Sequence, residues 1–139
     1  MVAGTSGLAA QVSGLTTLDS LRDRARPLLI FAPKPDDPRL EIQLRTLKEH
    51  AAETQERDLV PIALPFHTPS PTDAVLAPGA AEAARRRFHV APGDFAVILI
   101  GKDGGAKLRS DKPFSMEKLN ETIDAMPMRQ DEMKNKPGR

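Results

Sequence analysis

The spacing of apolar residues changes along the chain, and this spacing predicts the secondary structure. The segments PLLIFAP (27–33) and FAVILI (95–100) are continuously apolar, which is typical of strands buried on both faces. Leu40, Leu44 and Leu47 instead recur at helical spacing and predict an amphipathic helix. The predicted elements are strands over 27–33, 58–66, 95–100 and 106–110, and helices over 15–26, 39–57, 78–90 and 115–126.

Prolines and short polar residues mark where several of these elements begin and end. Asp37 and Pro38 suit the N-cap and the first position of the second predicted helix. Ser115 can cap the last helix, and Pro127 stops it. Pro61 has no backbone N–H to donate, so the second predicted strand should lie at an edge of the sheet or contain a bulge.

The segment GKDGG (101–105) follows an apolar strand and raises the question of a phosphate-binding loop. Such a loop needs a helix after its glycines. The residues that follow here instead alternate between apolar and polar, which is typical of a strand with one solvent-exposed face. The spacing also differs from G-x-x-x-x-G-K-[ST]. Because Asp-Gly supplies the positive φ of a tight turn, we predict a β-hairpin with Lys102 and Asp103 as solvent-exposed tip residues.

The order of the main elements, β-α-β-α-β-β-α, predicts the fold class. A strand–helix–strand unit demands a parallel pair of strands with a right-handed crossover. A hairpin and a final helix then complete a four-stranded mixed sheet with helices on both faces, which is the thioredoxin-like α/β arrangement. A flavodoxin-like sheet is the alternative, but it needs more βα units. We predict an N-terminal leader at 1–25, partly flexible with a short helix, a thioredoxin-like domain at 26–126 and a charged, fraying C-terminal tail at 127–139.

Composition narrows the classes of function. The 139 residues fit one domain that can bury its own core. The net charge of +1 and the absence of Trp and Tyr argue against nucleic-acid binding, and no apolar run approaches the roughly 20 residues of a membrane span. The N-terminus is not an intact signal peptide, so an exported mature chain and a cytoplasmic protein both remain open.

Cysteine is absent, which excludes disulfides, thiol redox chemistry and Cys-ligated zinc. No two of His50, His67 and His89 have the spacing of a local zinc motif, so we predict no metal and no cofactor. The basic run RRR (85–87) lies one helical turn after Glu82, and this pattern is typical of a solvent-exposed helix end. Binding of phosphate or a polyanion by this run is the alternative.

Three stretches resemble the signature blocks of a known family: RPLLIFAP (26–33), FAVILIGKDGGAKLRS (95–110) and the specific block IDAMPMRQDEM (123–133). They are similar to the domain of unknown function called P-DUDES, found in stand-alone bacterial proteins and in sushi-repeat and equarin-type extracellular proteins. The resemblance implies a thioredoxin-like fold and a peroxide- or thiol-related activity. In that superfamily the reactive Cys stands where this chain has PKPDDP (33–38), so we do not expect the redox chemistry here.

Two hypotheses for the function follow. The first, which we favour, is a non-catalytic module that binds a protein partner, with an exposed apolar patch near the last helix. In it, Asp124 and Arg129 could pair and fix the turn of the chain after Pro127. The possible family-signature or interaction residues are Lys102, Asp103, Asp124, Met126, Pro127, Met128 and Arg129.

The second hypothesis is a small-ligand binder or an enzyme that uses groups other than thiols. Its candidates are Asp36, Asp37, Asp103 and Arg129, and it requires them to converge on one pocket. Helix capping is the simpler interpretation of the two aspartates near the first helix. The sequence assigns no catalytic residue, and it leaves the oligomeric state open.

Overall fold

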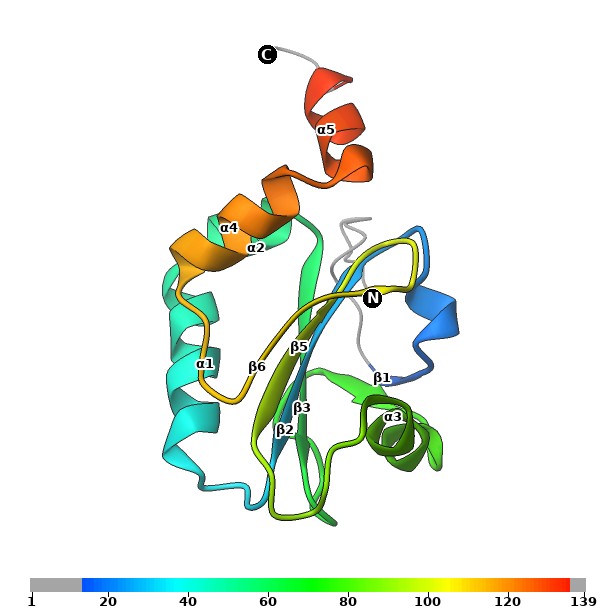
Figure 1. Cartoon of the computed structure of the whole chain (residues 1–139), viewed down its shortest axis with the longest axis vertical. Helices are drawn as coiled ribbons and strands as arrows, with labels where there is room; N and C mark the ends of the chain where they lie inside the picture. The colour runs from blue at the N-terminus through cyan, green and yellow to red at the C-terminus, as the bar shows by residue number, and fades with distance from the viewer. Residues whose placement is uncertain (1–13, 136–139) are drawn as a thin grey trace, which may run out of the picture.

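The computed structural model describes residues 14–135 and contains, within them, a four-stranded mixed sheet (Figure 1). The strand order is β3-β2-β5-β6. β2 (Arg26–Ala32) runs parallel to β3 (Leu59–Pro65) and antiparallel to β5 (Ala96–Ile100). β6 (Ala106–Ser110) completes the hairpin with β5. The predicted four-stranded mixed sheet, and the predicted order of its strands and helices along the chain, are confirmed.

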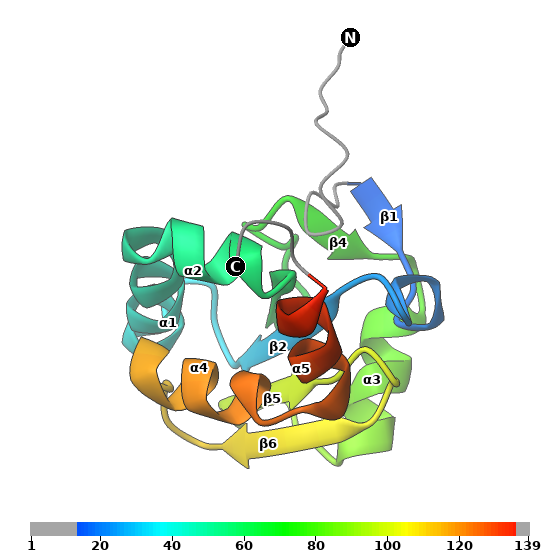
Figure 2. The same ribbon diagram turned by 90° about the horizontal axis from the view of Figure 1, so that it is seen from above.

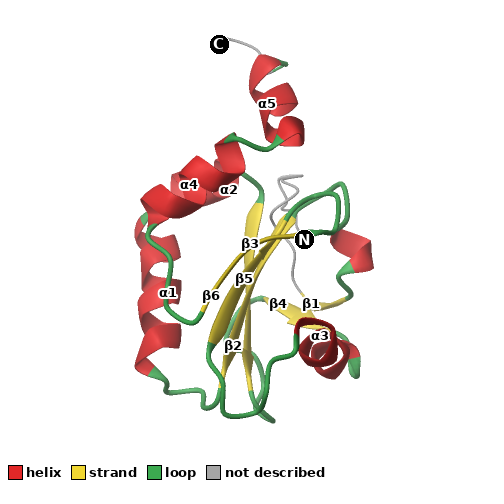
Figure 3. Ribbon diagram, in the orientation of Figure 1, coloured by secondary structure: helices red, strands yellow, loops and turns green. Residues whose placement is uncertain are grey.

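Helices cover both faces of this sheet, as predicted. α1 (Pro38–Glu49), α2 (Ala51–Glu56) and α4 (Met116–Asp124) lie on one side, and α3 (Ala80–Phe88) lies on the other (Figure 3). α5 (Pro127–Lys134) stands beyond the end of the sheet at which the β5–β6 hairpin turns (Figure 1).

The strict alternation of side chains along β2 explains the two layers. Leu28, Ile30 and Ala32 pack with the side chains of α1 and α4, whereas Leu29 and Phe31 pack with those of α3. All five are fully buried. Burying one large apolar side chain stabilises a fold by about 1.5–3 kcal/mol. Because the side chains of β2 are buried on both faces, the strand stabilises both layers of the core. Its continuously apolar sequence follows from that double burial.

Local signals at the element ends are confirmed as well. The Asp37 carboxylate accepts a hydrogen bond from the N–H of Arg39 at 2.9 Å at the start of α1. Ser115 Oγ accepts one from the N–H of Lys118 at 3.1 Å at the start of α4. In the hairpin turn Gly104 has φ 87°, a value that L-residues rarely adopt.

The N-terminal segment differs from the prediction. In place of a helix over 15–26 the structure has the short strand β1 (Gly14–Thr16) and the 3-10 helix η2 (Asp19–Leu21). β1 pairs in parallel with β4 (Ala74–Leu76), a strand that was not predicted. Pairing with a distant strand therefore overrides the weak helical spacing of the leucines. Residues 1–13 of the predicted leader lie outside the described residues.

Two further corrections concern helices. The predicted helix over 39–57 is divided at His50, whose φ of −121° and ψ of 45° are not helical. The C-terminal segment was expected to fray, but α5 forms there as far as Lys134, because its charged residues pair with other elements. Residues 136–139 lie outside the described residues. The division into leader, domain and tail stays a prediction.

Candidate functional site

The loop between β2 and α1 contains PKPDDP, the segment at the position of the superfamily's reactive sulfur. Asp37 is buried there and pairs with the Arg39 guanidinium at 2.7 Å. The hydrogen bond from the Arg39 side chain lowers the pKa of Asp37, so this carboxylate is a poor general base. Asp36 is exposed. Within this segment Asp37 therefore acts as the N-cap of α1.

The candidates of the small-ligand hypothesis do not converge. Asp36 and Asp37 lie where β2 ends, whereas Asp103 is in the hairpin turn at the other end of the sheet (Figure 1). Asp103 is exposed and pairs with Lys107 at 2.7 Å. Arg129 lies on α5 and is buried. The geometry gives that set of residues no common pocket.

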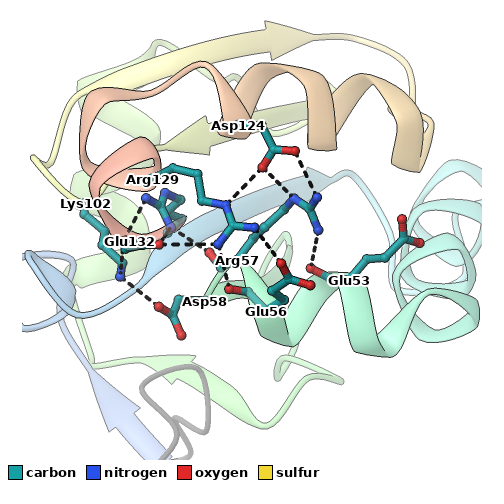
Figure 4. Close-up of polar contacts among 9 residues, drawn as sticks. Glu53, Glu56, Arg57, Asp58, Lys102, Asp124, Arg129 and Glu132 are labelled. Atoms are coloured by element: carbon teal, nitrogen blue, oxygen red, sulfur yellow. Dashed lines mark hydrogen bonds and ion pairs between the residues drawn. The ribbon is translucent and has the colours of Figure 1, made fainter. Parts of the chain in front are cut away.

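Charged side chains gather where α5 meets the starts of β2 and β3 and the β5–β6 hairpin (Figure 4). These starts are neighbours because the two strands are parallel, with Arg26 opposite Leu59. We call this group the α5 ion cluster. Its members are Arg26, Glu56, Arg57, Asp58, Lys102, Asp124, Arg129 and Glu132.

Arg129 is the most deeply buried member contributed by α5, with 1% of its surface exposed. Its Nε donates to Asp124 Oδ1 at 3.0 Å, and its Nη2 donates to Glu56 Oε2 at 2.8 Å. Burial lowers the pKa of Arg129, but hydrogen bonds to Glu56 and Asp124 outweigh this and raise it. The predicted pairing of Asp124 with Arg129 is thus confirmed, and it joins the end of α4 to α5.

Glu132 links the same helix to the sheet. Its carboxylate accepts hydrogen bonds from Arg26 Nη2 at 3.1 Å and from Lys102 Nζ at 2.7 Å. Lys102 Nζ also donates to Asp58 Oδ2 at 2.8 Å. Burial raises the pKa of Glu132, but the bonds from Lys102 and Arg26 outweigh this effect and leave it lowered. Glu132 therefore stays ionised within the cluster.

Asp124 has a second cationic partner that fixes α4 against α2. Arg57 donates to its two carboxylate oxygens from Nε and Nη2, each at 3.0 Å. Burial raises the pKa of Asp124, but hydrogen bonds from Arg57 and Arg129 outweigh it, and the pKa is lowered. Such two-pronged guanidinium–carboxylate pairs are the strongest and most directional of protein ion pairs.

The α5 ion cluster is electrically balanced, with four cations against four carboxylates. Each cation has at least one carboxylate partner, so the cluster offers little attraction to a charged ligand. Among its buried side-chain nitrogens, Arg26 Nε has no hydrogen-bond partner. The α5 ion cluster holds α5 against the rest of the domain. In the described chain, Arg129 is the one buried residue of this helix.

Two expectations about this end of the molecule were wrong. Lys102 was predicted to be an exposed tip residue, but it is only 8% exposed, because Asp58 and Glu132 neutralise it. The expected apolar patch near the last helix is not formed. Of the large apolar residues in the described range, only Met128, at 37%, and Ile42 on α1 are exposed. Met126 is buried, in line with the core position predicted for it.

Five members of the α5 ion cluster were not predicted from the sequence: Arg26, Glu56, Arg57, Asp58 and Glu132. A signal for Arg26 and Asp58 existed, because they stand at the starts of two apolar segments that were predicted to pair in parallel. The Arg26 N–H indeed donates to the Asp58 carbonyl at 2.7 Å. Glu132 carried no such signal, since it lies in a highly charged segment where most side chains are exposed.

A second surface of interest is the outer edge of β6. Within residues 14–135 this strand pairs with β5 alone, and Figure 2 shows it at the rim of the molecule. Arg109 on β6 donates to the Phe88 carbonyl on α3, and Arg87 on α3 donates to the Gly104 carbonyl at 2.8 Å. Neither arginine forms an ion pair with a carboxylate of the described residues.

Two searches of the described residues bear on metals and membranes. No group of three or more His, Asp or Glu side chains in residues 14–135 is arranged to hold a metal ion. In the same range, no helix has both the length and the apolar character needed to cross a membrane.

A comparison with protein-family models finds one match, to the family described as Domain of unknown function (DUF4174). It covers residues 17–132, which include every strand of the main sheet and all five α-helices apart from the last residues of α5. No curated protein matches the chain.

Two solved structures that are similar to this chain are a peroxiredoxin and a thioredoxin. A reduced 2-Cys peroxiredoxin of Plasmodium vivax matches with a TM-score of 0.58 and 14% identity, covering 82% of this chain and 84% of that one. A chloroplastic thioredoxin z matches with a TM-score of 0.48 and 14% identity, covering 80% of this chain and 90% of the other. With the sheet order, the first likeness establishes the predicted thioredoxin-like α/β fold. At such low identity it shows the fold alone.

Proposed function

This chain belongs to the DUF4174 family, and from that premise we propose that it is a non-catalytic thioredoxin-like module that binds a protein partner along the open edge of β6. We also propose that the chain is related to the P-DUDES family. The three blocks that resemble that family fall on β2, the β5–β6 hairpin and the junction of α4 with α5, and all three belong to the same domain. The observation that carries the proposal is the outer edge of β6, which pairs with no strand among residues 14–135.

The absence of cysteine supports a role in binding. A thioredoxin-type reaction needs a thiolate at the start of α1, and this chain has no cysteine at all. The start of α1 is instead occupied by Asp37, whose lowered pKa reflects its hydrogen bond from Arg39. The C-terminal segment with Met126 and Met128 exposes too little apolar surface to serve as a docking patch.

An open sheet edge binds an extended segment by adding a strand to the sheet. The main chain of the partner then supplies hydrogen bonds to the N–H and C=O groups that the edge leaves free. The opposite edge is less suited to this, because β3 contains Pro61 and the hydroxyl of Thr72 accepts from the Ala63 N–H at 3.1 Å. Of the two edges, β6 is therefore the better site.

The charges beside β6 indicate which kind of segment would fit. Arg87 and Arg109 lack carboxylate partners in the described chain, and both are exposed. An extended segment rich in Asp and Glu would pair with them while it adds to the sheet. A basic segment would be repelled. We thus propose an acidic, extended partner peptide.

The experiment is a selection from two displayed peptide libraries that alternate β-branched residues with either Asp and Glu or Lys and Arg. We expect binders from the acidic library only. In ¹⁵N-labelled protein, the bound peptide should shift the amide signals of residues 106–110 most strongly. Affinity should fall as NaCl is raised, since exposed charges are screened.

Matched variants separate the edge from general electrostatic attraction. Arg87→Glu should weaken the selected peptides by about tenfold or more, because it reverses a charge beside β6. Lys48→Glu makes the same change in charge on exposed α1, across the sheet from α3, and should leave binding unchanged. Binders that shift signals on another surface, or that tolerate Arg87→Glu, would contradict the proposal; the cations of β6 would then serve only to discourage edge-to-edge association.

A further inference from the structure

A cavity of about 480 Å³ lies beside the carboxyl end of β3, where the following loop, β4 and the start of α3 come together. Figure 3 shows β4 and α3 on the side of the sheet opposite α1 and α4. The volume falls within the roughly 300–1,000 Å³ of small-molecule sites. Much of its wall is apolar, with contributions from Phe66, Pro69, Val75 and Pro78. An amphipathic small molecule could therefore bury its apolar part here.

Arg85 supplies a positive charge in the wall of this cavity. Its guanidinium carbon lies 5.2 Å from the ring centre of Phe31 and 5.0 Å from that of Phe66. Nη2 donates to the Leu64 carbonyl at 2.8 Å, and Nη1 makes a long bond of 3.4 Å to the Ala91 carbonyl. A guanidinium has five N–H groups, so donors remain for another acceptor.

The charge of Arg85 is not neutralised by an ion pair in the described chain, in contrast to the cations of the α5 ion cluster. Burial lowers the pKa of Arg85, and the negative charge of Asp94 offsets only part of this effect. A half-buried charge without a counter-ion is costly in free energy. An anionic ligand would relieve that cost, and the planar guanidinium fork suits a carboxylate.

The start of α3 adds donors to the same cavity. Gly79 is the N-cap, and it has no side chain that could cap the helix. The N–H groups of Ala81 and Glu82 find no acceptor among the described residues, and both residues line the cavity. The exposed Glu82 carboxylate opposes a multiply charged anion but is compatible with a single negative charge.

We propose that this cavity binds a small amphipathic monocarboxylate, with Arg85 pairing with its carboxylate and the apolar wall holding its body. The site is independent of the strand-binding edge, since β3 and β6 lie at opposite edges of the sheet. Failure of either experiment leaves the other proposal standing.

The test uses the whole chain and two matched pairs of probes, phenylacetate with phenylacetamide and hexanoate with hexanamide. Each acid differs from its amide in charge and hardly in shape. We expect at least one acid at 10 mM to raise the melting temperature by about 3 °C, and neither amide to do so. Amide signals of residues 81 and 82 should shift in ¹⁵N-labelled protein when that acid is added.

Variants then assign the site. Arg85→Lys should bind the acid about tenfold more weakly, because it keeps the charge and loses the fork, and Arg85→Met should not bind it. Since Arg85→Met also loses the bond to Leu64 and could fail to fold, Ala81→Leu provides a second variant, which fills the cavity and leaves Arg85 in place. Arg86→Met, on an exposed neighbour, should bind as the wild type does.

Several results would overturn the proposal. They are the absence of a shift with both acids, equal binding of an acid and its amide, and undiminished binding by folded Arg85→Met or Ala81→Leu. Phenyl phosphate serves as a third probe. If it binds more tightly than phenylacetate, the assignment to a monocarboxylate is wrong.

Discussion

Replacing Arg129 by methionine tests whether the α5 ion cluster holds the C-terminal helix in place. Methionine has nearly the same helix propensity as arginine and matches the first part of its side chain, so the change removes the charge and keeps much of the apolar stem. In the wild type this side chain is 2% exposed and pairs with Glu56 and Asp124. Arg129→Met would leave both carboxylates without that partner.

The expected loss follows from the burial of the partners. Removing one member of a fully buried ion pair costs about 3–5 kcal/mol, because the other charge stays behind without compensation. Here the side chains of Glu56 and Asp124 are 35% and 36% exposed, so water solvates them in part, and Asp124 keeps Arg57. We therefore expect a loss of about 2–3 kcal/mol, equivalent to a fall of roughly 6–12 °C in Tm.

Urea unfolding followed by circular dichroism measures this loss, and hydrogen exchange of the amides of residues 127–134 reports whether α5 opens on its own. The control is Arg86→Met, which removes an exposed arginine and should change stability by no more than about 0.5 kcal/mol. Faster exchange confined to α5, with a smaller global loss, would mean that the helix detaches as a unit. If Arg129→Met matches the control in both measurements, the cluster does not hold the helix.

Three further predictions concern stability. Burial raises the pKa of Glu132, but its cationic partners outweigh this and lower it. The contribution of Glu132 to stability should therefore be complete above its ordinary pKa of 4.5, and it should be lost as the pH falls through the lowered pKa of the folded state. In urea unfolding at a series of pH values, Glu132→Gln should make the stability less dependent on pH over this acidic range. Asp37→Ala removes an N-cap and should cost about 1 kcal/mol in urea unfolding, whereas Asp36→Ala should be nearly neutral. Gly104→Ala places a side chain at φ 87° and should lower stability by about 1–2 kcal/mol, while Gly93→Ala, which meets open space, should not.

Much of the fold could be predicted because its signals are local. The buried strand at 27–33 and the helix that Asp37 caps were both recognisable from a few neighbouring residues. The hairpin followed from Asp103 and Gly104, since a positive φ is a property of one residue. The strand β1 was missed because it has only three residues, and its existence depends on β4, which lies far away in the sequence.

The candidate sites were harder to predict, and the adjacent residues Lys102 and Asp103 show the reason. Both were expected to be exposed at the hairpin tip. Asp103 pairs with Lys107, four residues away, and stays exposed. Lys102 pairs with Asp58 and Glu132, at separations of 44 and 30 residues, and is buried. Nothing in the local pattern distinguishes the two.

The sequence by itself determined the four strands of the main sheet, the two helix caps, the hairpin turn and the absence of cysteine, because periodicity, backbone preference and atomic composition are properties of short segments. Only the tertiary structure decided which charges are buried, whether the C-terminal segment is a helix, and that Arg85 lines a cavity without a carboxylate partner among residues 14–135. The physical reason is that the state of a charged side chain depends on its solvation and on its partners. For Arg129 one of those partners, Glu56, is 73 residues away along the chain.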